Sequence, residues 1–162
     1  MIQVTLIKRK KGSETLKMSN KQGFEFLEHT ADEYVKAYGA SLEEAFESAA
    51  LAMFEVMTDI ETIEPKDEES VEVDAEDEES LLYLWLESLL IKFDVDQKLY
   101  SRFNINKIKR KEGGVSLNAT IWGETYDPNK HPSRTDIKAI TYHRMEILKE
   151  NHKTVLKFIL DI

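Results

Sequence analysis

Apolar and polar residues alternate along several stretches of the chain, which predicts a protein rich in β-strands. A Glu112-Gly113-Gly114 break separates two of these stretches, as is typical of a β-hairpin. In residues 71–73, two valines alternate with acids, and we expect a short exposed strand there. The predicted strands cover residues 24–28, 34–38, 71–73, 102–111, 115–122, 137–149 and 154–161.

Two other stretches carry apolar residues three and four positions apart, the spacing of an amphipathic helix. Ser41 begins the first, and Glu44 three residues later completes a capping box ahead of an apolar face that continues to Met57. Asp77 can cap the second, from about residue 78 to residue 93, and this helix has the widest apolar face. The order of elements predicts an α+β fold: a single-domain sandwich with a mostly antiparallel sheet and two helices on one face.

The composition describes one folded domain: the chain has 162 residues, of which 41% are hydrophobic. It contains no Cys, which excludes a disulfide framework, a thiolate nucleophile and a Cys-based zinc site. It has neither a run of roughly 18 apolar residues nor the apolar core of a signal peptide. We therefore predict a cytoplasmic protein with no membrane partner.

The first residues differ in pattern from the rest of the chain. A brief alternation of apolar residues is followed by the basic run 8–11 and then by polar residues, with Met18 as an alternative start. We expect residues 1–21 to be a flexible or non-native extension and residues 22–162 to form the domain.

The negative charge is concentrated in one part of the chain. The formal net charge is −9, and residues 61–80 hold 11 acidic residues and a single Lys. Such a surface repels polyanions, so the sequence does not favour direct binding of nucleic acid. Two interpretations are open: a solvated acidic connector, or a docking surface for a basic protein partner.

Carboxylates also occur at the ends of predicted strands. Asp32 follows the first strand, Asp161 ends the last one, and Ile162 contributes the terminal carboxylate. If these strand ends meet, three anionic oxygen donors favour a hard cation, Ca²⁺ or Mg²⁺. The alternatives are that Asp32 stabilises a turn and that Asp161 forms an ion pair with Lys138 or Lys157.

A second group of ionisable residues lies between Gly123 and His143. Glu124 and His131 are candidates for general acid–base chemistry, and a metal-dependent hydrolase with one of them as base is one interpretation. The motifs of an activated nucleophile are missing. The simpler expectation is that His131 is exposed in a polar loop and that His143 is a structural residue within a strand.

Taken together, these motifs resemble archease over about residues 24–162, with every motif in order. The motifs that carry the resemblance are His29-Thr30-Ala31-Asp32, Gly39-x-Ser41-Leu42-Glu43-Glu44-Ala45-Phe46, Gly123-Glu124, Lys130-His131, Ile137-Lys138-Ala139-x-Thr141-Tyr142-His143 and Asp161-Ile162.

The resemblance implies a protein that is not itself an enzyme but assists an RtcB-type RNA ligase in tRNA splicing and RNA repair. By position, the metal site of the family falls on Asp32, Asp161 and Ile162, with Ca²⁺ as the first choice of ion and Mg²⁺ as the second. Lys130, His131 and Lys138 match the loop-and-strand motif and are candidates for contact with the ligase. The resemblance also implies an alternative role, as a chaperone or modulator of a tRNA cytosine methyltransferase.

Overall fold

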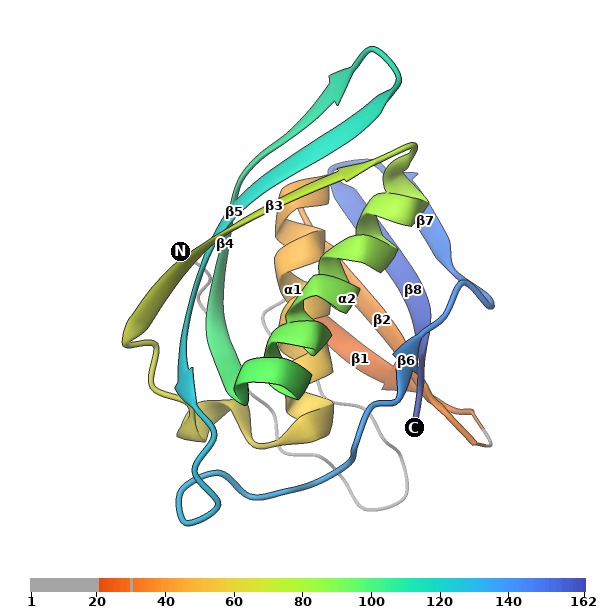
Figure 1. Cartoon of the computed structure of the whole chain (residues 1–162). Coiled ribbons are helices and arrows are strands. Elements are labelled where there is room, and N and C mark those ends of the chain that lie inside the picture. The colour runs from red at the N-terminus through yellow and green to blue at the C-terminus, as the bar shows by residue number, and fades with distance from the viewer. Residues whose placement is uncertain (1–20, 30) are drawn as a thin grey trace.

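The computed structural model describes residues 21–29 and 31–162, in which two antiparallel sheets pack against two helices that lie between them (Figure 1). The first sheet has the order β1-β2-β8-β6, and β7 pairs with another part of β8. The second has the order β3-β5-β4. The first sheet consists of β1 (Gly23–Leu27), β2 (Glu33–Gly39), β6 (Ala139–Ile140), β7 (Glu146–Glu150) and β8 (Lys153–Asp161). The second consists of β3 (Asp67–Ala75), β4 (Lys98–Lys111) and β5 (Gly114–Thr125).

Helix α1 (Leu42–Met57) runs between the sheets and contacts strands of both. Its start is capped as predicted, because the Ser41 hydroxyl oxygen accepts the Glu44 amide at 3.2 Å. The Glu44 carboxylate in turn accepts the Ala40 amide at 2.8 Å. After Met57 the chain passes through the short 3-10 helix η1 (Ile60–Thr62) into β3.

Helix α2 (Glu78–Asp96) lies beside α1 and begins with the predicted Asp77 cap. It extends three residues beyond the expected end and stops at Gln97, which has a left-handed backbone. The Trp85 indole N–H donates to the Phe46 carbonyl at 3.0 Å and so ties the two helices together. Helices, sheets and class agree with the predicted α+β single domain.

A buried carboxylate on α1 accepts a hydrogen bond from a backbone amide on an edge strand of the second sheet. Glu47 is 7% exposed, and its carboxylate accepts the Ile105 amide of β4 at 2.8 Å and the Gln22 side-chain amide at 3.3 Å. Burial raises the pKa of Glu47. The carboxylate thus provides a hydrogen-bond partner for an edge amide that has no neighbouring strand.

The strand prediction was wrong in two places. Residues 137–149 are not one strand, since only β6 and residues 146–149 of β7 form strands, and His143 lies in an exposed turn between them. The strand expected over residues 71–73 runs the length of β3, and Val71 and Val73 are buried beneath α2 rather than exposed. The acidic stretch is therefore partly a structural strand and not only a solvated connector.

Within residues 21–29 and 31–162, no helix combines the length and apolarity required to cross a membrane. Apart from Lys21, the extension predicted over residues 1–21 lies outside the described part of the chain.

Candidate functional site

In the first sheet, the start of β2 and the end of β8 lie side by side, which brings the start of the domain and the end of the chain together. Strands β2 and β8 are antiparallel, and Glu33 pairs with Leu160. Asp32 directly precedes Glu33 and Asp161 directly follows Leu160, so the two aspartates continue the same register. On the other side of β8, Ala139 pairs with Asp161. The strand pairing therefore places Asp32 beside the last two residues.

An open pocket of about 660 Å³ lies at this edge. Asp32, His29 and Ile162 line it together with neighbouring residues of the loop between β1 and β2. The C-terminus lies beside this loop in Figure 1. The side chain of Ile162 is partly buried and packs against the core, which fixes this residue at the pocket.

The ion pair considered for Asp161 is not formed. Lys157 instead pairs with Glu146 at 3.9 Å, and Lys138 contributes its backbone amide to the Asp161 carbonyl at 2.7 Å. Across the described part of the chain, no Lys or Arg lies within ion-pair distance of Asp32 or Asp161. These half-buried carboxylates therefore remain open to a positive ligand.

The donor set suits a hard cation. Two carboxylates and the terminal carboxylate offer only oxygen, the ligand type that Ca²⁺ and Mg²⁺ prefer. Nδ1 of His29, a neighbour in the pocket, is buried and has no hydrogen-bond partner among the described atoms. No three His, Asp or Glu side chains of residues 21–29 and 31–162 converge as metal ligands, so the side chains of Asp32 and Asp161 alone do not complete a set of cation ligands.

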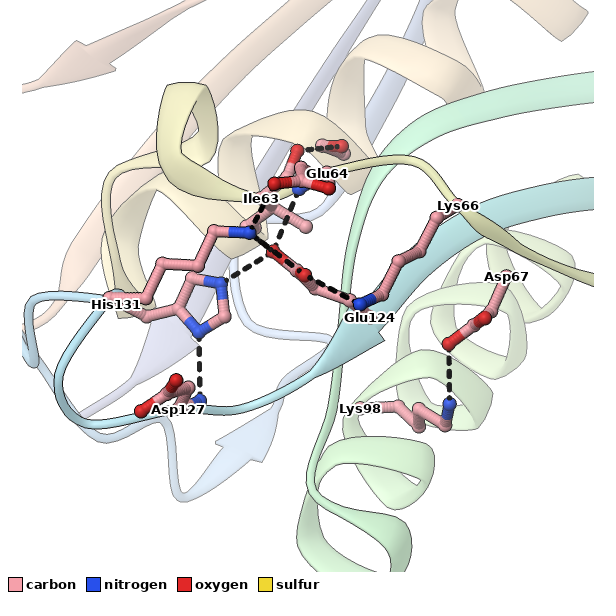
Figure 2. A network of polar contacts seen from close by, with 10 residues as sticks. Ile63, Glu64, Lys66, Asp67, Lys98, Glu124, Asp127 and His131 are labelled. Carbon is pink, nitrogen blue, oxygen red and sulfur yellow. Dashed lines mark hydrogen bonds and ion pairs between the residues drawn. The ribbon is translucent and has the colours of Figure 1, made fainter.

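Two other predicted residues, Lys130 and His131, contact the buried Glu124 at the end of β5 in a separate network (Figure 2). His131 Nε2 lies 2.8 Å from the Glu124 carboxylate, and His131 Nδ1 accepts the Asp127 amide at 2.9 Å. Because Nδ1 is an acceptor, the ring proton is on Nε2 and is donated to Glu124. The Glu64 amide also donates to Glu124, at 2.8 Å.

Lys130 gives this network its positive charge. Its ammonium group lies 2.8 Å from the Glu124 carboxylate and 2.7 Å from that of Glu64. Burial raises the pKa of Glu124, but the hydrogen bonds from Lys130, the Glu64 amide and His131 together lower it to about 2. The hydrogen bonds that Lys130 donates to the carboxylates of Glu124 and Glu64 raise the pKa of Lys130. Glu124 is therefore ionised at neutral pH, and its carboxylate accepts hydrogen bonds from Lys130, His131 and the Glu64 amide.

The expectation that His131 is exposed is wrong, because only 1% of the residue's surface is accessible to solvent. Both ring nitrogens are occupied, and Glu124 is 3% exposed. Neither group can take a proton from a bound water in this arrangement, so the network does not support the hydrolase interpretation. Its evident effect is to hold the loop between β5 and β6 against the segment that follows η1.

Sequence reasoning missed the partners of this loop. Glu64 lies 60 residues from Glu124, and nothing in the acidic stretch of residues 61–80 indicates that its amide donates to Glu124. Arg134 forms an ion pair with the buried Glu55 of α1, and its amide donates to the Met57 carbonyl at 3.1 Å. The available signal was a pair of acids, Glu47 and Glu55, within the apolar face of a helix, because such acids require buried partners.

Comparisons with known proteins all point to one family. Residues 24–162 match the model of the Archease protein family. The chain is similar to Protein archease of Sulfurisphaera tokodaii, with 49% identity over 87% of this chain and 99% of the relative. It is also similar to Protein archease of Methanothermobacter thermautotrophicus, with 47% identity over 87% and 99%.

Two solved structures share the fold. The solution structure of Methanobacterium thermoautotrophicum Protein 1598 has a TM-score of 0.74 and 45% identity, covering 86% of this chain and 99% of that one. The crystal structure of an archease from Thermotoga maritima, described as a possible chaperone, has a TM-score of 0.54 and 20% identity, covering 84% and 94%. The second supports the fold alone.

Proposed function

Since this chain belongs to the archease family, we propose that it is a cation-binding protein cofactor, not an enzyme, that activates an RtcB-type RNA ligase. It would act in the cytoplasm, in tRNA splicing and RNA repair. The observation that carries the proposal is the edge of the first sheet, where Asp32 and Ile162 line an open pocket, the strand register places Asp161 beside them, and no Lys or Arg of residues 21–29 and 31–162 pairs with either aspartate.

We assign the cation to Asp32, Asp161 and the terminal carboxylate of Ile162. Ca²⁺ is the first choice because it accepts irregular sets of oxygen ligands, and Mg²⁺ is the second. When bound, the ion would supply a fixed positive charge at an otherwise acidic surface. The chain contributes rigidity, because β2 and β6 flank the end of β8 and the side chain of Ile162 packs against the core.

Activation requires that the cofactor bind one state of the ligase better than another. We propose that the pocket edge docks near the nucleotide site of the ligase and favours the state that accepts guanylate, which also allows repeated turnover. Lys138 is exposed beside this edge and is a candidate contact. Lys130 is one-third exposed, and we keep it as a second candidate. His131 would act indirectly, by holding the loop that carries Lys130.

The test is ligase guanylylation with substoichiometric amounts of this protein. Wild-type protein should raise turnover, whereas Asp32→Asn and Asp161→Asn should not, because each removes one anionic donor and preserves shape. Glu112→Gln, in the exposed turn between β4 and β5, is the matched control and should activate normally. Full activation by both aspartate variants would refute the assignment.

A second candidate is a chaperone for a tRNA cytosine methyltransferase. Exposed acids on β3, including Glu68, Glu72 and Asp74, favour it because they could cover a basic, aggregation-prone surface. Light scattering by the methyltransferase should then fall when this protein is added. Unchanged scattering, together with activation of the ligase, would leave the first candidate alone.

A further inference from the structure

A groove of about 460 Å³ lies between α2 and β3, and its lining shares no residue with the pocket at Asp32 or with the Glu124 network. Ile91 and Val95, one helical turn apart on α2, line it and are 52% and 72% exposed. Ser70, Val71 and Glu72 of β3 form the other wall. Two large apolar side chains exposed on one helical face beside a strand form a surface suited to contact with another chain.

The strand that borders this groove is an edge strand. Within the described residues β3 pairs with β5 alone, so the backbone groups on its other edge take no part in a ladder. An extended segment can add to such an edge through main-chain hydrogen bonds, while its alternate side chains reach the adjoining surface. The groove therefore offers both a backbone template and an apolar contact.

The charge around the groove identifies the chemistry of the occupant. Glu72 and Asp96 line it and are exposed, and Glu68 and Asp94 lie nearby on the same two elements. The lysine in the lining, Lys92, already forms an ion pair with Glu69 at 3.4 Å. The other charged residues that line the groove, Glu72 and Asp96, are acids, which attract lysine and arginine side chains.

We propose that this groove binds an extended, lysine- and arginine-containing segment of the RNA ligase, which adds to β3 and places an apolar side chain against Ile91 and Val95. This inference rests on the proposed function. It separates two tasks of the protein: the groove provides affinity for the partner, and the pocket edge with Asp32 provides activation.

The experiment measures binding of the purified ligase to the full chain at several salt concentrations. The double variant Ile91→Ser with Val95→Ser should weaken binding about tenfold or more, because it removes apolar contact area. The double variant Glu72→Lys with Asp96→Lys should weaken binding and flatten its salt dependence. Leu148→Ser, at an apolar side chain on β7 that is 40% exposed, and Glu112→Lys with Glu150→Lys are the matched controls and should bind as wild type does.

The outcomes distinguish the inference from the proposed function. Normal binding by both groove variants would overturn the inference, while activation by wild-type protein would leave the proposed function standing. Failure of the wild-type protein to bind the ligase would overturn both. Self-association of this chain that the groove variants abolish, with ligase binding unchanged, would show that a second copy occupies the groove and would also overturn the inference. Groove variants that fail to bind but keep their thermal stability support it.

Discussion

Replacing Glu124 with Gln removes one buried charge and keeps the shape of the side chain. In the folded protein the pKa of Glu124 is about 2, against an ordinary value of 4.5. Each unit of difference corresponds to roughly 1.4 kcal/mol, so the ionised carboxylate contributes about 3 kcal/mol to the free energy of unfolding at neutral pH. Glu124→Gln should lose about that amount at pH 7, because Lys130 and His131 keep only a neutral partner.

The pH dependence of this loss gives the sharper test. A carboxyl whose folded pKa is lowered stabilises the protein fully above its unfolded pKa, and this contribution is lost as pH falls towards the folded pKa. The difference between wild type and Glu124→Gln should therefore be constant from pH 7 to about pH 5 and shrink between pH 4.5 and pH 2.

Urea unfolding, followed by the fluorescence of the buried Trp85, measures this difference at each pH. Glu112→Gln, in an exposed turn, is the control and should behave as wild type does at every pH. A loss that stays the same from pH 7 down to pH 2.5 would refute the reasoning, because the charge of Glu124 would then not be its source.

Two further variants probe the scaffold. Gly123→Ala should cost about 3 kcal/mol of stability by urea unfolding, because a Cβ there would lie 1.8 Å from the Leu99 carbonyl oxygen; a loss below about 1 kcal/mol would contradict this close approach. Arg134→Met leaves Glu55 buried without its cation. Burial raises the pKa of Glu55 to about 7 even with Arg134 present, so the carboxyl disfavours the folded state increasingly as pH rises from 4.5 through 7. Arg134→Met should therefore lose more stability at pH 8 than at pH 5, with a difference of up to about 1.4 kcal/mol, because Glu55 without its cation stays protonated one pH unit above the folded pKa of the wild type; equal losses at the two pH values would contradict this.

The features that were predicted correctly from the sequence depend on residues close together along the chain. The cap formed by Ser41 and Glu44 spans four positions, and the alternation that defines β4 and β5 continues to the turn that joins them. The meeting of Asp32 with the chain terminus is a longer-range feature. It was predicted only on the condition that the strand ends next to Asp32 and Asp161 meet, and the pairing of β2 with β8 fulfils this condition.

The features that sequence missed depend on residues far apart in the chain. His131 lies in a loop interrupted by proline, and its burial depends on Glu124 and on the Glu64 amide, which lies 60 residues from Glu124. The burial of Val71 depends on α2, which covers one face of β3. Residues 137–149 alternate well enough for a strand, but β8 pairs with only part of them. Local periodicity reports none of these tertiary contacts.

The central claim is that the beginning of the domain and the chain terminus hold one divalent cation together. Calorimetric titration with Ca²⁺ tests it most directly, with wild-type protein, Asp32→Asn, and a chain extended by one glycine after Ile162. The extension converts the terminal carboxylate into a peptide carbonyl. We predict one site in the wild type and an affinity about tenfold or more lower in both altered chains. Equal affinity in all three would contradict the account.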